Sequence, residues 1–254
     1  MKRNLLAILM AGQFRWIEFC SDNLVDDLDI LVADDATPRI EEFCATRGLN
    51  FVTKPKANGG CDSWNLIYRY FLEHDYDKCI ISHDDVFFPP GFSDGLFAAL
   101  DAGYDLVCPV TNEPGHKPQQ RYENFTDKLG FRSVMADLKT KHSGKDDFRE
   151  KNVRGVNGFC FAFGRSIQKY AFNEDTLVDT SFCNCGCDDA ISRSVEENGG
   201  KMCICLTSYV HHFRSGTRIL TGHRHNLWTE STKLDEPVLK LGPHRELLKK
   251  KHER

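Results

Sequence analysis

The sequence predicts a single α/β domain with a mostly parallel central sheet flanked by helices. Three observations support this class. Apolar runs with strand character alternate with helical segments over residues 5–110, a pattern that implies parallel pairing and right-handed crossovers. Two of these runs end in paired aspartates, at the strand ends where open α/β sheets bind ligands. The chain has 254 residues, enough to bury the core of one large domain.

The first elements follow from local patterns. Continuous apolar runs predict buried strands at Leu5–Met10, Leu28–Ala33 and Leu49–Thr53. A short helix is predicted between the first two strands, at Phe14–Cys20. A second helix begins near Pro38, because proline suits a first turn, and ends at Gly48.

A longer amphipathic helix is predicted over residues 61–74. Its apolar face recurs at i, i+3, i+4 and i+7 and consists of Trp64, Ile67, Tyr68 and Phe71. A fourth strand then ends at His83-Asp84-Asp85, before the break at Pro89-Pro90-Gly91. A helix over residues 92–102 and a fifth strand at Tyr104–Val110 complete the alternating part of the chain.

The pattern changes after Val110. Residues 111–152 are polar and mixed in charge, and a segment of this length predicts a binding loop or lid. Beyond it, we expect a buried strand at 158–164, a helix from Asp188 to Asn198 and a strand at 202–206. The predicted division is one domain over residues 1–217 and a basic, helical extension over residues 218–254.

Composition bears on the class of partner. The net charge of −4 gives no reason to expect nucleic-acid binding. The longest early apolar run, Leu5–Ala11, is too short to cross a bilayer and has no signal-peptide cleavage site after it. We therefore expect a cytoplasmic protein without a transmembrane segment. The basic end, Lys249–Arg254, is compatible with peripheral contact to an anionic membrane, and equally with a solvated helix end.

The chain contains eleven cysteines. An odd number without a secretory signal favours free thiols over a disulfide framework. A zinc site is the alternative, on the set Cys183, Cys185, Cys187, Cys203 and Cys205. Its CxCxC and CxC spacings differ from the CxxC pairs typical of zinc ribbons and fingers, and buried thiols are common.

The acidic strand end at residues 83–85 is the main candidate for a metal site. Asp85 and Asp84 can hold Mn²⁺ or Mg²⁺, with His83 as a neighbour or ligand, and such ions usually share their ligands with substrate phosphates. A solvated turn explains paired aspartates equally well. His211 and His212 also follow a strand and can bind metal or phosphate, although a structural histidine is more frequent.

Two further acidic pairs have both a functional and a structural interpretation. Asp34 and Asp35 can accept hydrogen bonds from a nucleobase or a ribose, or can cap the helix that follows. Asp188 and Asp189 can supply a general base, or can cap a helix and favour its N-terminus by their charge. Parallel pairing would place the pairs at 34–35 and 84–85 at the same edge of the sheet.

Several motifs are absent. Residues 11–14 follow the first strand without a GxGxxG pattern, which argues against a dinucleotide cofactor. The sequence has no GxxxxGK[ST] and no GxSxG, which disfavours a P-loop nucleotidase and an α/β-hydrolase.

Taken in order, these segments resemble the family-2 glycosyltransferases of the GT-A fold. The matching segments are residues 31–37 (LVADDAT), 56–65 (KANGGCDSWN), 82–86 (SHDDV), 158–162 (GFCFA), 187–190 (CDDA) and 210–212 (VHH). The family's "ED" segment is Asp-Asp here, and His83 occupies the first position of its DxD metal motif. No QxxRW motif is present, which argues against a processive synthase.

The resemblance implies a reaction and a set of roles. A hexosyl or pentosyl group would move from a UDP-, GDP- or dTDP-linked donor to a hydroxyl of a glycan or lipid-linked acceptor, with inversion and with Mn²⁺ or Mg²⁺. Asp189, or else Asp188, would be the base. The metal would lie at Asp85, His83, His211 and His212. The residues implied in donor binding are Asp34, Asp35, Asn58, Gly59, Asp84 and Arg193.

Two alternatives remain at this point. A sugar-phosphate nucleotidyltransferase shares the sheet topology, but such enzymes usually have a glycine-rich basic loop after the first strand, where this chain has one glycine and Arg15. A non-catalytic, cysteine-rich zinc-binding interaction protein is the alternative from another functional class.

Overall fold

In the computed structural model, the described residues are 3–10, 12, 14–56, 60–112, 119, 148–149, 155–179 and 186–213. Within them the α/β class is confirmed. The first half contains β1 (Asn4–Met10), α1 (Phe14–Asn23), β2 (Asp29–Asp34), α2 (Ile40–Arg47), β3 (Asn50–Thr53), α3 (Gly60–Glu73) and β4 (Lys78–His83). The second half contains β5 (Val86–Phe87), α4 (Phe92–Asp101), β6 (Leu106–Thr111), β7 (Phe148–Arg149), β8 (Cys160–Gly164), η2 (Arg165–Lys169), α6 (Cys187–Glu197) and β9 (Met202–His212).

Most element boundaries agree with the sequence patterns to within two residues. The last strand is the main exception, because β9 continues past the predicted end at Leu206 to His212. The fourth strand ends at His83, as predicted, but a further short strand, β5, follows Asp85 and was not predicted. Both differences matter for the site, because β9 pairs with β5 and so brings His212 beside Asp85.

The sheet is mixed rather than mostly parallel. Its strand order is β3-β2-β1-β4-β8-β6-β9-β5, with β7 paired to β9. Strands β1 to β4 pair in parallel, as do β6 and β9, whereas β8 runs antiparallel to both of its neighbours. The strand–helix alternation that implies parallel pairing stops at Thr111. Nothing in the sequence beyond that point constrained the direction in which β8 enters the sheet.

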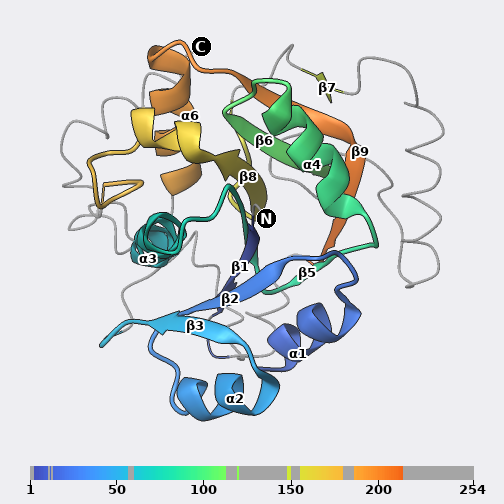
Figure 1. The fold of residues 1–254 in the computed structure, drawn as a ribbon, viewed down its shortest axis with the longest axis vertical. Coiled ribbons are helices and arrows are strands. Elements are labelled where there is room, and N and C mark those ends of the chain that lie inside the picture. The colour runs from blue at the N-terminus through green and yellow to red at the C-terminus, as the bar shows by residue number, and fades with distance from the viewer. Residues whose placement is uncertain are drawn as a thin grey trace, which may run out of the picture.

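Helices cover both faces of the sheet (Figure 1). Alternate residues of each strand point to opposite faces, and the core accordingly has two halves. One half packs the sheet against α3 and α6, through side chains such as Trp64 and Ile191. The other half packs it against α1, α2 and α4, through side chains such as Ile17 and Phe92. The predicted apolar face of α3 is buried as expected.

The expectation of free thiols was wrong at two positions. Cys61, at the start of α3, forms a disulfide with Cys187, at the start of α6. The two cysteines are 126 residues apart in sequence, and only their approach in the fold reveals the pairing. The other cysteines in the described part of the chain are free and buried, including Cys203 and Cys205. Cys187 is therefore unavailable to the zinc site that was the alternative.

The strand register places the carboxyl ends of β2, β1 and β4 side by side. Ala33, Leu9 and His83 lie at the same level across these three strands. Since neighbouring strands lie about 4.8 Å apart, the end of β2 is roughly 10 Å from the end of β4. None of the helices in the described ranges has the length and apolar character needed to cross a membrane.

Candidate functional site

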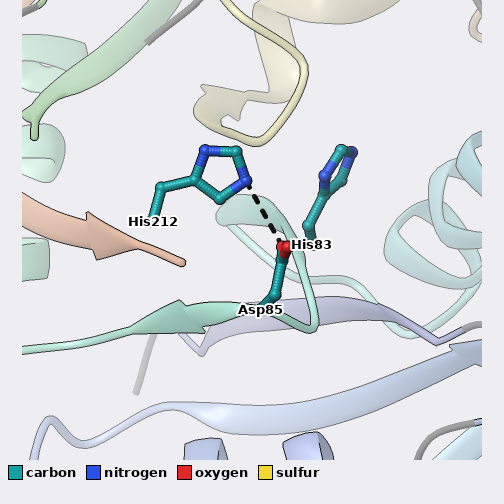
Figure 2. A group of neighbouring side chains, drawn as sticks. All are labelled: His83, Asp85 and His212. Carbon is teal, nitrogen blue, oxygen red and sulfur yellow. Dashed lines mark ion pairs between the residues drawn. The ribbon is translucent and has the colours of Figure 1, made fainter. Parts of the chain in front are cut away.

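Three side chains gather at the carboxyl edge of the sheet. They are His83 at the end of β4, Asp85 between β4 and β5, and His212 at the end of β9, and one ligand atom from each lies within 4.8 Å of the others. Figure 2 shows the Asp85 carboxylate directed toward the His212 ring, with Oδ1 3.4 Å from Nε2. The Asp85 and His212 side chains are 6% and 12% exposed, so solvent screens this group only weakly.

The fold assembles this group from distant parts of the chain. Strand β5 pairs antiparallel with the end of β9, which sets Val86 opposite His212. The amide of Phe213 donates a hydrogen bond to the backbone oxygen of Asp85 at 2.9 Å. Phe159, which precedes β8, stacks its ring on the His212 imidazole at a centroid distance of 4.7 Å. These contacts hold Asp85 and His212 side by side on a rigid backbone.

Two residues predicted for this site have other surroundings. Asp84 is buried, but it is not part of the three-residue group. His211 likewise lies outside that group, and its Nδ1 forms a 3.0 Å hydrogen bond with the hydroxyl of Tyr209. Burial, followed by the charge of His212, lowers the pKa of His211 from 6.5 to about 4. His211 is therefore a neutral, buried histidine at ordinary pH.

The acidic pair at the start of α6 divides into two environments. Asp188 accepts hydrogen bonds from the amides of Gly158 and Asp189, each at 3.0 Å. Burial, followed by the neighbouring charge of Asp189, raises the pKa of the Asp188 carboxyl. Asp189 is half-buried in the same first turn, and Arg193 follows one turn later with similar exposure. Both aspartates favour the helix N-terminus by their charge.

Residues 158–159 connect this acidic pair to the three-residue group. Gly158 donates its amide hydrogen bond to Asp188, while Phe159 stacks on His212 and accepts a 2.8 Å hydrogen bond from the amide of His83. A side chain at position 158 would come within 3.3 Å of Asp188. The acidic pair and the three-residue group therefore both contact one short segment, residues 158–159.

The aspartates at the end of β2 are held by protein contacts. Asp34 Oδ2 accepts hydrogen bonds from the Thr37 amide and the Thr53 hydroxyl, each at 2.7 Å. Asp35 Oδ1 lies 2.5 Å from Nζ of the buried Lys54. Neither aspartate caps α2, whose N-cap residue makes no side-chain capping hydrogen bond. The predicted donor residues Asn58 and Gly59 lie outside the described residues.

The three-residue group fits a divalent metal ion. Two imidazoles and one carboxylate supply nitrogen and oxygen donors, and they leave positions for water or a ligand. Imidazole suits transition metals, whereas Mg²⁺ prefers oxygen ligands. The donor set therefore suits a divalent metal ion.

Sequence reasoning missed several residues that shape the site. Asn112 follows β6 and makes two hydrogen bonds to the backbone of His212. As a polar residue at a strand end, it carried the same signal as the aspartate pairs. Phe159 and Lys54 act through contacts that only the fold brings about. The disulfide between Cys61 and Cys187 likewise depends on an approach that only the fold brings about.

Comparison with known proteins gives the fold. No protein-family model matches the sequence, and no curated protein matches it. A crystal structure of GalNAc-T7 with UDP, GalNAc and Mn²⁺ matches with a TM-score of 0.57 and 13% identity, over 83% of this chain and 44% of that one. A structure of residues 1–349 of S. aureus TarS matches with a TM-score of 0.52 and 8% identity, over 83% of this chain and 60% of that one.

This chain thus spans less than two thirds of each of these two proteins. At such low identity the likeness concerns the fold. The mixed sheet with helices on both faces, and the group of possible ligands at its carboxyl edge, agree with that likeness. The chain has the GT-A fold.

Proposed function

We propose that this protein is a glycosyltransferase that moves a sugar from a nucleotide-diphosphate donor to a hydroxyl acceptor. One observation carries the proposal: on a GT-A fold, the group His83, Asp85 and His212 and the acidic pair Asp188 and Asp189 both contact the same segment, residues 158–159. A transferase of this kind needs positive charge beside a leaving diphosphate and a base beside the acceptor. The two groups supply candidates for these two functions.

His83, Asp85 and His212 would hold the divalent ion. When bound, such an ion supplies positive charge that stabilises the leaving diphosphate. The low exposure of the group strengthens electrostatic interactions there. GalNAc-T7, whose structure contains UDP, GalNAc and Mn²⁺, supports a nucleotide, a sugar and a metal as ligands for this fold.

Asp189 is the better candidate for the base. The carboxylate of Asp188 already accepts backbone hydrogen bonds on both of its oxygens, and it anchors α6 to residue 158. Asp189, which the family resemblance makes the first candidate, lies in the first turn of α6 and would accept the proton of the acceptor hydroxyl. Attack from the face opposite the leaving diphosphate would invert the configuration at the anomeric carbon.

The end of β2 would bind the nucleotide. Asp34 Oδ1 is buried and has no hydrogen-bond partner among the described residues, which leaves it able to accept a hydrogen bond from a base or ribose. Asp35 would contribute beside Lys54. The further donor-binding residues proposed from the family resemblance are Asn58, Gly59, Asp84 and Arg193.

A ligand panel tests this proposal. The protein would be mixed with UDP-, GDP- and dTDP-sugars in the presence of Mn²⁺, in the presence of Mg²⁺ and without added metal, and its melting temperature measured. We expect one nucleotide class to stabilise the protein, and to do so more strongly with Mn²⁺ than with Mg²⁺. A hydrolysis and transfer assay would follow on that donor.

The matched variants for this panel are Asp85→Asn and Asp94→Asn. Asp85 belongs to the candidate metal group, whereas Asp94 is an exposed residue of α4. Asp85→Asn should abolish Mn²⁺-dependent stabilisation and transfer, and Asp94→Asn should leave both unchanged. Full Mn²⁺-dependent transfer by Asp85→Asn would refute the metal assignment.

A further inference from the structure

We propose that Asn112 is a positioning residue that fixes the metal ligand His212, an inference that rests on the proposed function. Asn112 directly follows β6 and is 6% exposed. Its side-chain amide donates a hydrogen bond to the backbone oxygen of His212 at 3.1 Å. Its side-chain oxygen accepts a hydrogen bond from the backbone amide of His212 at 2.8 Å.

The two bonds extend the sheet by one residue through a side chain. The parallel pairing of β6 with β9 ends where Thr111 lies beside Val210. Beyond that point the Asn112 side chain takes the place of a paired strand residue, and it hydrogen-bonds both the amide and the carbonyl of His212. On the other edge of β9, strand β5 pairs with the same residue through Val86. The backbone of His212 is therefore held from both sides.

The Asn112 amide is itself held in one orientation. The hydroxyl of Thr111 donates a hydrogen bond to Asn112 Oδ1 at 3.0 Å. That oxygen therefore faces two donors, the Thr111 hydroxyl and the His212 amide, and the NH₂ group faces a carbonyl. If the amide were reversed, its NH₂ group would face the His212 N–H and its oxygen would face the His212 carbonyl. The network therefore fixes which way the side chain points.

Such a contact affects metal binding because ligand geometry controls affinity. Groups that orient metal ligands without touching the metal typically change affinity by about 10-fold to 100-fold when mutated. The backbone of His212 carries the imidazole that faces Asp85. If the backbone loses its fixed position, the imidazole is displaced from the other two ligands, His83 and Asp85.

The chain offers a matched control for this residue. Asn65 in α3 makes the same pair of hydrogen bonds to the backbone of Val178, at 2.9 and 3.0 Å, and is 2% exposed. Asn65 is thus a buried asparagine with the same two hydrogen bonds, but the residue that it holds lies outside the metal group. If the loss of these bonds acted only on the stability of the fold, variants of Asn65 and Asn112 would show the same change in Mn²⁺ affinity.

The test measures Mn²⁺ affinity by calorimetry or by the paramagnetic signal of free Mn²⁺ for the parent, Asn112→Ala and Asn65→Ala. We expect Asn112→Ala to weaken Mn²⁺ binding by about 10-fold or more, and Asn65→Ala to stay within about 2-fold of the parent while losing comparable thermal stability. Asn112→Gln, which keeps the amide but moves it by one methylene, covers the case in which the alanine variant does not fold.

Two results would overturn the inference in distinguishable ways. If the parent binds Mn²⁺ and a folded Asn112 variant binds it equally well, Asn112 does not position the ligand, and the proposed function is unaffected. If the parent binds no Mn²⁺, or if Asp85→Asn binds it as the parent does, the assignment of the metal site is wrong. The role inferred for Asn112 is then refuted as well.

Discussion

At the scale of single residues, neighbouring side chains of the same type have different surroundings. Asp188 accepts backbone hydrogen bonds on both carboxylate oxygens, whereas its neighbour Asp189 donates its own backbone amide to one of those oxygens. His212 faces Asp85, whereas His211 pairs with Tyr209. In each pair the sequence offers two equivalent candidates, and the direction of the side chain separates them. The roles that follow can be tested one residue at a time.

The acidic pair gives the first prediction. Asp189→Asn should lower kcat for transfer by about 10²- to 10⁴-fold, the usual contribution of a general base, with little change in melting temperature. Asp188→Asn should mainly lower the melting temperature, because an amide NH₂ would face a backbone N–H in place of a carboxylate oxygen. Steady-state kinetics and thermal melts of both variants check this. The reverse distribution of effects would make Asp188 the base.

His211 gives a prediction about pH. Its pKa is lowered from 6.5 to about 4 in the fold, so between these values the unfolded chain binds a proton that the folded chain does not. Stability is therefore greatest above about pH 6.5 and falls as the pH drops toward 4. Urea unfolding at pH 7 and pH 5 should show this loss, and His211→Gln should reduce it. An identical pH dependence in the variant would assign the effect to other groups.

At the scale of elements, the disulfide joins the starts of two helices that carry the candidate site. Cys61 is the second residue of α3, and Cys187 is the first residue of α6 and directly precedes Asp188. The bond therefore fixes the start of α6, and with it the acidic pair, against the start of α3. The same two helices pack on one face of the sheet through their apolar side chains. The covalent link adds to a contact that packing already provides.

Breaking the disulfide should cost stability. A bond that closes a loop of this length removes entropy from the unfolded chain, and such bonds typically contribute about 2–5 kcal/mol. We expect the Cys61→Ser and Cys187→Ser variants to show a loss in this range in denaturant titrations, and the parent in reducing agent to behave like them. Variants as stable as the oxidised parent would show that the link contributes nothing to the fold.

At the scale of the whole molecule, the candidate site depends on how the strands are ordered. The carboxyl ends of β2 and β4 lie at the same edge of the sheet, because both strands pair in parallel with β1, which lies between them. His212 reaches Asp85 because β9 runs on past β6 to pair with β5. A donor bound at this edge would contact strands from both halves of the sheet. Its binding energy would therefore stabilise the folded molecule as a unit.

The expected rise in melting temperature in the ligand panel follows from the ratio of ligand concentration to Kd. A ligand at a hundredfold excess over its Kd stabilises a protein by about 2.7 kcal/mol. For a domain of this size, that corresponds to a rise of about 5–10 °C in melting temperature. The matching donor with Mn²⁺ should approach this range, and donors with other bases should fall below it. Equal shifts for every nucleotide would indicate nonspecific anion binding.

Much of the fold could be predicted from local sequence, and much of the site could not. Helices such as residues 61–74 have an amphipathic period that is visible without the structure. Asp85 could be predicted to lie at the carboxyl edge of the sheet, because it directly follows an apolar, strand-like run, but its approach to His212 could not. The disulfide, the antiparallel β8 and the Asn112 contact depend on approaches between residues far apart in the chain. Local patterns carry no information about such approaches, so the pairing of Cys61 with Cys187 could not be foreseen.

The segment at residues 158–159 has a consequence for how the protein would respond to its ligands. The amide of Gly158 contacts the acidic pair, and the ring of Phe159 contacts the candidate metal group. A shift of the backbone there would move both groups together. In the proposed transferase, a ligand bound at one group should thus alter affinity at the other, and donor and acceptor would bind cooperatively within a single subunit.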